Sequence, residues 1–396
     1  MPKSRKRRKP KQSSRRARGP ARTGPPKLAS GHLGDRLPYL AQMAAVDEAE
    51  RRGDARAALD LIEERLLDTD GNLFWRGDRI IRLTQLASLG PLLPRWATSR
   101  WLLEQALQEL GPSGRPIVGQ ALQAVADVHG GLGHVRRPSG EDPRIKVLEH
   151  DWVFRQCLLY ELGGLASYLR RVPLHLVTGA DRVDEWARAP MGGYRFVERG
   201  SAVTVWEDVA SGDRTETANI GSAAMLLLGE CAIGRLVPID GGRMFETVPL
   251  RVPEGVACAV AAEPAGWLSA LRDAVRAGER IETGGTRFGF LTDVPRVASV
   301  LTVYDELDLL DRYPERAEKL LACVREAFDE EPTKDPDAVD VWACVAAELL
   351  HPSVLSALAD GLRPSDAELY TRLAQTVAEP AATLARLLAS EARDVA

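Results

Sequence analysis

The spacing of apolar residues changes twice along this chain, and that change constrains the fold more than any other feature of the sequence. From residue 35 to 178, apolar side chains recur at helical spacing, as at Ala58, Leu59 and Ile62. Between 194 and 252 the apolar runs are short and rich in β-formers, and helical spacing then resumes. We therefore predict an α+β fold that is predominantly helical, with a small β-module inserted between two helical regions.

The β-module is predicted to contain five short antiparallel strands. Turn residues separate the runs, and Asp240-Gly241-Gly242 is a strong signal for a two-residue hairpin. The expected strands are 194–198, 202–207, 215–219, 231–238 and 244–252. Five such strands in about sixty residues favour a barrel-like module or a curled sheet.

The helices are expected at 37–52, 55–67, 75–89, 96–110, 116–128, 151–171, 265–277, 315–328, 338–350, 365–377 and 381–391. Residues 38–66 include the string AERRGDARAALDLIEE, which resembles the turn and second helix of a tetratricopeptide unit. Gly53 and Asp54 stand where that motif places its turn, and Ala58 stands at its small packing position. Asp70 replaces the closing proline, and no second copy follows. Because stacked repeats need about three units, we expect a helical hairpin within a larger helical domain.

Length and composition indicate an ordinary globular protein. The chain has 396 residues, of which 45% are hydrophobic and 27% are charged, which suggests roughly two to three domains. We expect a basic tail at 1–34, a helical domain at 35–178, the β-module at 179–262 and a C-terminal helical domain at 263–396. The five cysteines are scattered, and no apolar run is long enough to span a membrane. These features predict a cytoplasmic protein with no membrane association.

The charge of the chain is divided very unevenly. Residues 1–27 contain five Lys, seven Arg and no acid, a net charge of +12, whereas the remaining residues carry −16. Such a segment has almost nothing to bury, so it is expected to be disordered in isolation. The stretch from 305 to 340 is the acidic counterpart, with a local charge of −8.

The tail is a candidate for non-specific attachment to a nucleic-acid backbone. Its dense positive charge suits binding by counterion release, and the absence of aromatic residues argues against sequence-specific readout. A solubilising role and a contact with the acidic stretch remain open as alternatives. The candidate nucleic-acid-binding residues are Lys3, Arg5, Lys6, Arg7, Arg8, Lys9, Lys11, Arg15, Arg16 and Arg18.

A set of histidines and aspartates provides the only candidate catalytic residues. Their order along the chain resembles that of the metal-dependent HD phosphohydrolases, which implies a divalent metal that activates water. The weak candidates are His129, His134, His150, Asp151 and Asp181. Asp151 also stands at the start of an expected helix, where a carboxylate accepts backbone amides. We favour this capping interpretation and expect no metal and no cofactor.

Other signatures of catalysis are absent from the sequence. There is no Walker loop, GxGxxG, GxSxG, HExxH or CxxC motif. The β-module contains Tyr194, Phe196 and Trp206 together with Arg235 and Arg243, a mixture that small barrels use either as core and rim or as a binding face. Core packing is the favoured interpretation for the aromatic side chains.

The sequence therefore favours a non-enzymatic adaptor or regulatory protein. Helical surfaces would bind protein partners, and the basic tail would attach the assembly to nucleic acid. The alternatives are a metal-dependent phosphohydrolase and a structural scaffold with a solubilising tail. The sequence specifies neither the partner nor the oligomeric state.

Overall fold

The computed structural model describes residues 33–67, 74–111, 116–135, 142–284, 288–294, 313–329 and 340–395. The basic tail up to residue 32 and half of the acidic stretch from 305 to 340 lie outside the described residues. The predictions made for those two segments therefore stay predictions.

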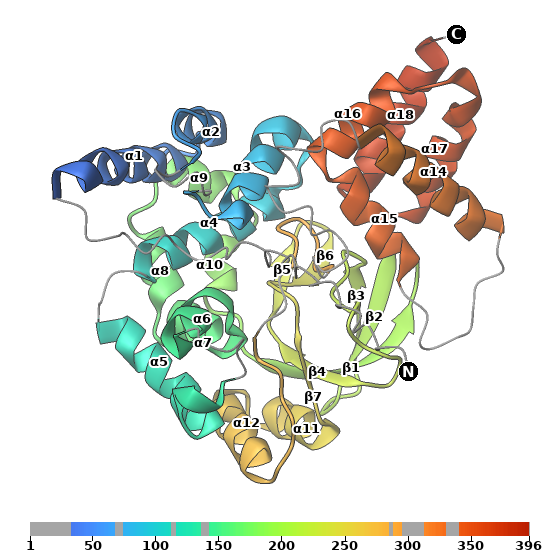
Figure 1. Ribbon diagram of the computed structural model, residues 1–396. Helices are drawn as coiled ribbons and strands as arrows, with labels where there is room; N and C mark the ends of the chain where they lie inside the picture. Colours follow the sequence, from blue (N-terminus) through green and yellow to red (C-terminus); the bar gives the residue numbers. More distant parts are fainter. Residues whose placement is uncertain are drawn as a thin grey trace, which may run out of the picture.

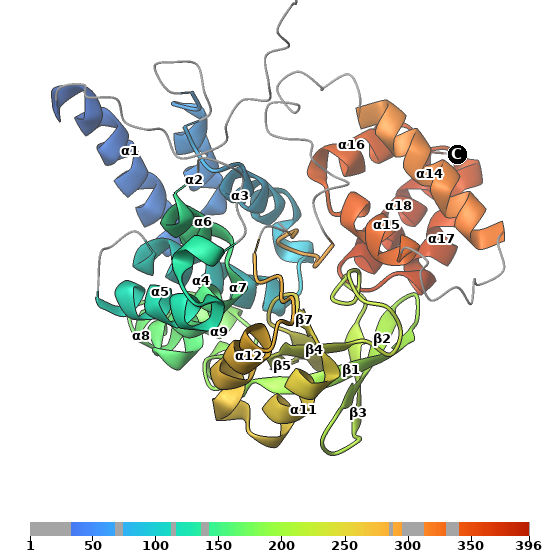
Figure 2. The same ribbon diagram turned by 60° about the horizontal axis from the view of Figure 1, so that its bottom comes forward.

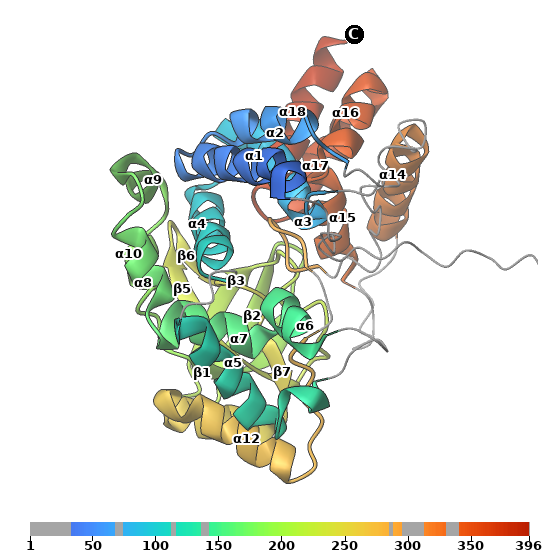
Figure 3. The same ribbon diagram turned by 60° about the vertical axis from the view of Figure 1, so that its left-hand side comes forward.

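Ten α-helices precede the sheet in the described part of the chain. Their bounds are α1 (Leu33–Arg51), α2 (Ala55–Glu63), α3 (Gly77–Leu89), α4 (Arg95–Leu110), α5 (Pro116–His129), α6 (Pro143–His150), α7 (Trp152–Gln156), α8 (Gly164–Leu169), α9 (Leu174–Gly179) and α10 (Val183–Trp186). Figures 1 and 3 show that α4 lies between the α1–α2 hairpin and the sheet.

The expected hairpin is present as α1 and α2. The side chain of Asp54 caps α2 by accepting a hydrogen bond of 2.9 Å from the backbone N–H of Ala57. Gly53 has a φ of +81°, and a Cβ at this position would lie 2.4 Å from the side chain of Leu176. The turn therefore needs glycine both for its conformation and for the close approach of α9.

The single helix expected at 151–171 is wrong, because the chain there is broken twice. A π-helix (Cys157–Glu161) follows α7 directly, and α8 begins after Gly163, which has a φ of +68°. A Cβ on Gly164 would lie 2.2 Å from the carbonyl oxygen of Leu158. The two glycines thus allow a sharp turn that apolar periodicity does not reveal.

The sheet has seven strands, not five, and it is mixed, not purely antiparallel. The strands are β1 (Gly192–Arg199), β2 (Val203–Asp208), β3 (Arg214–Ala218), β4 (Cys231–Gly234), β5 (Leu236–Ile239), β6 (Gly242–Phe245) and β7 (Leu250–Val252). Their order is β5-β6-β3-β2-β1-β4-β7, and β3 pairs with β6 in parallel. The expected hairpin at Asp240-Gly241 is confirmed, since Ile239 pairs with Gly242.

Arg235 explains why one expected strand became two. It lies between β4 and β5, it is 5% exposed, and its guanidinium donates to Gln156, Glu161 and the carbonyl oxygen of Ala189. This anchoring turns the chain away from β1, so that β5 joins the opposite edge of the sheet. The sheet consequently curls around Phe196, Trp206 and Phe245, which are fully buried, as core packing requires.

Further helices follow the sheet: α11 (Glu254–Ala262), α12 (Trp267–Arg276), α14 (Tyr313–Asp329), α15 (Val341–Leu349), α16 (Pro352–Asp360), α17 (Ala367–Thr376) and α18 (Ala381–Asp394). Short 3₁₀ turns lie at Gly90–Leu92, Leu132–His134, Pro264–Gly266 and Pro364–Asp366. Helices α11 and α12 lie beside each other below the sheet, and α14–α18 gather on one side of the molecule (Figures 1 and 2).

The C-terminal helices are joined to the rest of the chain by apolar packing and by buried hydrogen bonds. One apolar cluster extends from the α1–α4 region into α14–α18. Gln85 Nε2 donates to the carbonyl oxygen of Leu350 at 3.0 Å, and Asn219 Nδ2 donates to Asp340 Oδ2 at 3.0 Å. Asp340 also caps α15, so one carboxylate both starts a helix and ties it to the β-module.

No single helix in the described ranges is long and apolar enough to cross a bilayer, although the sharply bent pair α15 and α16 passes that test jointly.

Candidate functional site

Three elements far apart in the sequence meet around the hydroxyl of Thr283. His129 is the last residue of α5, Asp151 precedes α7, and Thr283 lies in the extended chain after α12. Thr283 Oγ1 donates to Asp151 Oδ2 at 2.7 Å and lies 2.9 Å from His129 Nε2. Because the hydroxyl proton goes to the carboxylate, the imidazole Nε2–H donates to the hydroxyl oxygen. We call this chain of three side chains the relay.

Burial dominates the titration of the relay. Asp151 is 3% exposed, and burial raises the pKa of its carboxyl to about 6, against the lowering effect of hydrogen bonds from Thr283 and from the backbone N–H of Phe154. Burial also lowers the pKa of His129, and the nearby His134 lowers it further. The structure therefore places a carboxyl with a raised pKa in one hydrogen-bonded chain with an imidazole whose pKa is lowered.

The capping interpretation of Asp151 is confirmed. Its Oδ1 accepts a hydrogen bond of 2.9 Å from the backbone N–H of Phe154, in the first turn of α7. The backbone N–H of Trp152 donates to the carbonyl oxygen of Thr283 at 2.6 Å. The start of α7 and the segment around Thr283 are thus clamped by main-chain and side-chain bonds together.

The remaining sequence candidates are only partly brought together. His134 Nδ1 lies 3.1 Å from the carbonyl oxygen of His129, and His150, at the end of α6, lies 3.6 Å from Glu149. Asp181 is elsewhere, where its Oδ2 accepts from the backbone N–H of Asp240 at 2.5 Å. Across the described segments, no group of three or more His, Cys, Asp or Glu side chains is arranged to hold a metal ion.

Sequence reasoning missed Thr283, which joins the two ends of the relay. It is separated from His129 by 154 residues and from Asp151 by 132 residues. A threonine in the string RIETGG carries no local signature, so nothing in the sequence connects it to either partner.

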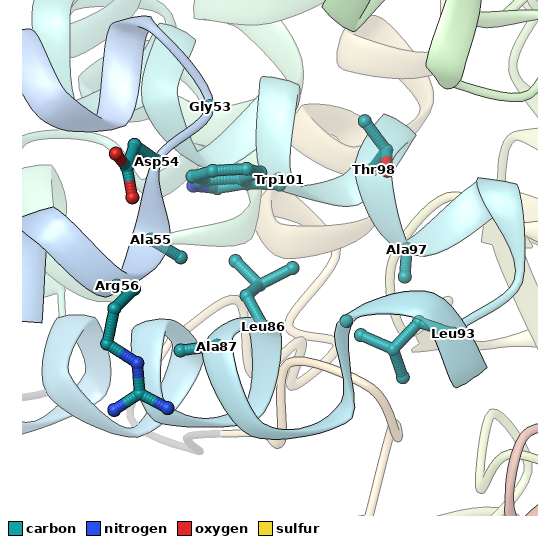
Figure 4. Close-up of a pocket in the computed structure, with 11 residues that line it drawn as sticks. Gly53, Asp54, Ala55, Arg56, Leu86, Ala87, Leu93, Ala97, Thr98 and Trp101 are labelled. Atoms are coloured by element: carbon teal, nitrogen blue, oxygen red, sulfur yellow. The ribbon is translucent and has the colours of Figure 1, made fainter.

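A pocket of about 330 Å³ lies among the start of α2, the end of α3 and the first half of α4. Figure 4 shows its aliphatic lining together with the rim residues. The lining consists of Gly53, Asp54, Ala55, Arg56, Leu86, Ala87, Gly90, Leu93, Ala97, Thr98 and Trp101. The turn that resembles a tetratricopeptide unit therefore forms one edge of the pocket.

The polar groups of this pocket include an unusual donor. Trp101 is 4% exposed, and its indole Nε1–H has no hydrogen-bond partner among the residues that the structure describes. Figure 4 shows the nitrogen-bearing edge of the ring turned toward Asp54. Buried indole N–H groups are usually paired, so an unpaired one beside a pocket calls for an explanation.

Comparison with known proteins gives no relative to reason from. No protein-family model, no curated protein and no solved structure matches this chain significantly.

Proposed function

We propose that this chain is a non-enzymatic adaptor or regulatory protein that binds protein partners through its helical region and nucleic acid through its basic tail. The observation that carries the proposal is the charge of residues 1–27, which is +12 with no acidic residue. A segment of that composition neutralises backbone phosphates and releases their counterions, whatever the base sequence. The partner bound by the tail is therefore a polyanion, and attachment is non-specific.

The state of the candidate catalytic residues supports a non-catalytic role. Both carboxylate oxygens of Asp151 accept hydrogen bonds from groups of the chain itself, from Thr283 and from the N–H of Phe154. Asp151 and Thr283 are 3% and 4% exposed, so a substrate has little access to them. These residues are better suited to holding three elements together than to activating water.

The proposal is tested by measuring the binding of a generic duplex as a function of salt concentration. If about six phosphates are neutralised, the logarithm of the affinity should fall with the logarithm of salt at a slope of roughly −5. Deleting residues 1–24 should abolish this binding and leave the thermal unfolding of the remaining chain nearly unchanged, because the tail is expected to make few folded contacts.

A matched variant separates charge from geometry. Replacing the tail arginines by lysines should weaken duplex binding only modestly, since backbone neutralisation requires charge more than the bidentate geometry of guanidinium. If the intact chain shows no salt-sensitive binding to DNA or RNA at low ionic strength, the tail has no role in attachment, and a solubilising role or a contact with the acidic stretch takes its place.

A further inference from the structure

We infer that the extended chain after α12 is a strap with two clasps, one of which opens as the pH rises while the other stays closed. The strap consists of residues 279–284 and 288–294 in the part of the chain that the structure describes. Figure 1 shows it leading from α12 toward β5 and β6. The first clasp is formed at Thr283 and the second at Asp293. This inference goes beyond the proposed function and depends neither on the tail nor on a binding partner.

The first clasp holds the strap against the start of α7. Thr283 contributes its hydroxyl to the relay, and its carbonyl oxygen accepts a hydrogen bond of 2.6 Å from the backbone N–H of Trp152. The two segments approach so closely that a Cβ on Gly284 would lie 3.3 Å from the carbonyl oxygen of His150. The N–H of Trp152 therefore reports directly on whether this clasp is closed.

The second clasp holds the strap between α4 and the β-module. Asp293 is buried, and its two carboxylate oxygens lie 3.1 and 3.2 Å from the guanidinium of Arg100. Ser222 Oγ donates to the same carboxylate at 2.6 Å, and the backbone N–H of Asp293 donates to the carbonyl oxygen of Ile220 at 2.6 Å. Because a guanidinium keeps its charge throughout the range in which proteins are folded, we expect this bidentate pair to persist as the pH changes.

The carboxylate of the first clasp has no guanidinium beside it. Its direct hydrogen-bond donors are neutral, namely the hydroxyl of Thr283 and the backbone N–H of Phe154, and the charge of Lys146 acts from a greater distance. The titratable groups on the elements around Asp151 are His129 on α5, His134 in the turn that follows, Lys146, Glu149 and His150 on α6, Cys157 in the π-helix and Glu282 on the strap.

Opening of the first clasp is coupled to the ionisation of Asp151. Burial raises the pKa of its carboxyl to about 6, against an ordinary value of 3.8. When the clasp opens, water reaches the carboxyl and its pKa returns toward the ordinary value. Rising pH therefore favours the open clasp, and the effect levels off above the pKa of the closed form. Between about pH 4.5 and about pH 7.5 the equilibrium constant for opening should increase about twentyfold.

His129 acts in the opposite sense. Burial lowers the pKa of its imidazole, so rising pH favours the closed clasp through this group. The imidazole is only half-buried, whereas Asp151 is almost fully buried, so the carboxyl has the larger effect. Asp151→Asn removes the titration of the carboxyl and leaves His129 in place. The difference between the parent and this variant therefore isolates the carboxyl.

Hydrogen exchange of the full chain, followed by NMR and corrected for the intrinsic pH dependence of exchange, tests the inference. Relative to Asp151→Asn, the protection of the Trp152 amide should fall about twentyfold between about pH 4.5 and about pH 7.5. Low concentrations of urea should leave this exchange unchanged, because a local opening exposes little surface. The amide of Asp293 should be better protected, and its exchange should accelerate with urea, as expected for an amide that is released only by global unfolding.

Asp293→Asn is the matched control, since it replaces the other buried carboxylate of the strap by an amide. It should leave the pH dependence of exchange at Trp152 intact. If this variant does not fold, Ser222→Ala removes one donor from the same clasp and should give the same result. The comparison of the two amides within the parent needs no variant.

Three results would overturn the inference. If protection at Trp152 follows pH in the same way in the parent and in Asp151→Asn, the carboxyl does not control the clasp. If exchange at Trp152 accelerates with urea as much as exchange at Asp293, or if both amides are equally protected at every pH, the strap opens only when the whole protein unfolds. Duplex binding by the tail is a separate measurement and bears on none of these outcomes.

Discussion

Two groups of hydrogen-bonded polar side chains lie in the interior of this molecule, and they differ in whether their buried charges are paired with opposite charges. One is the relay of His129, Thr283 and Asp151. The other, which we call the ionic network, connects α4, α7, the π-helix and the sheet through Glu104, Arg155, Gln156, Glu161, Arg235 and Glu246. Both tie together elements that are distant in sequence, yet only the relay contains groups that are poised to change charge.

Opposite charges fix the ionisation of the network. Arg155 lies 2.5 Å from Glu104 and 3.7 Å from Glu246. Burial alone would raise the pKa of Glu104, but Arg155 and then Arg82 outweigh it and hold that pKa below its ordinary value. Burial would lower the pKa of Arg155, yet Glu104 and Glu246 together raise it. Glu104 and Arg155 therefore both stay charged across the physiological range.

The relay lacks a comparable counter-charge. The opposing influences on Asp151 are three hydrogen bonds and the more distant charge of Lys146, and burial exceeds them all. The pKa of its carboxyl consequently rises to about 6. The comparison shows that burial by itself does not decide the ionisation of a buried group. Such a group stays charged when an opposite charge lies beside it, and its pKa shifts toward the neutral form when none does.

The largest effect is expected for Arg235 in the ionic network. Arg235→Met keeps an unbranched side chain but leaves Gln156 Oε1 and the carbonyl oxygen of Ala189 without their donor in the core. Removing one partner from buried bonds of this kind costs about 3 kcal/mol of unfolding free energy. Urea unfolding followed by circular dichroism measures this loss.

Arg243 provides the matched control, because it is an exposed arginine of the same sheet. Arg243→Met should change the unfolding free energy by less than about 0.5 kcal/mol. Equal effects of the two substitutions would mean that the network contributes nothing beyond general sheet stability.

A smaller and pH-dependent effect is expected for Asp151 in the relay. The pKa of its carboxyl is about 6 in the folded chain, against an ordinary value of 3.8, so the folded state retains a proton that the unfolded state has released. Rising pH within this window therefore favours unfolding, and the loss levels off above the folded pKa. Between about pH 4.5 and pH 7 the contribution amounts to about 2 kcal/mol.

Asp151→Asn isolates this contribution. The amide oxygen can still cap α7, but the group no longer titrates. The variant should therefore gain about 2 kcal/mol relative to the parent between about pH 4.5 and pH 7 in chemical unfolding experiments. His129 shifts stability in the opposite direction, since its lowered pKa favours the folded state as pH rises, and it is present in both proteins. Parallel pH profiles of the two proteins would contradict the assignment.

A feature of this molecule could be predicted from the sequence when neighbouring residues determine it, and could not when distant residues do. Apolar periodicity is a local signal, so the hairpin of α1 and α2 and the turn at Asp240-Gly241 were predicted correctly. The break at Arg235 and the parallel pairing of β3 with β6 depend on contacts with distant residues, which no local pattern records. The capping role of Asp151 was readable because a cap is local. The role of Thr283 and the unpaired indole of Trp101 could not be predicted, because each depends on the tertiary contacts around the side chain.

The smallest effect concerns the hydroxyl that joins the two ends of the relay. Thr283→Val keeps the shape of the side chain but removes the donor to Asp151 and the acceptor for His129, whereas Thr283→Ser can keep both bonds. Each of the two hydrogen bonds contributes at least about 0.5 kcal/mol, so the valine variant should be less stable than the serine variant by roughly 1 kcal/mol or more at neutral pH. The bond from Thr283 also lowers the pKa of Asp151, so its removal should move that pKa above about 6. The difference in unfolding free energy between the two variants should therefore shrink as the pH falls and the carboxyl becomes protonated. NMR titration of the Asp151 carboxyl carbon can follow this protonation directly.

Equal stability and equal Asp151 titration in both variants would show that the hydroxyl does not link Asp151 to His129. The main-chain hydrogen bond at Trp152 would then suffice to hold the segment in place.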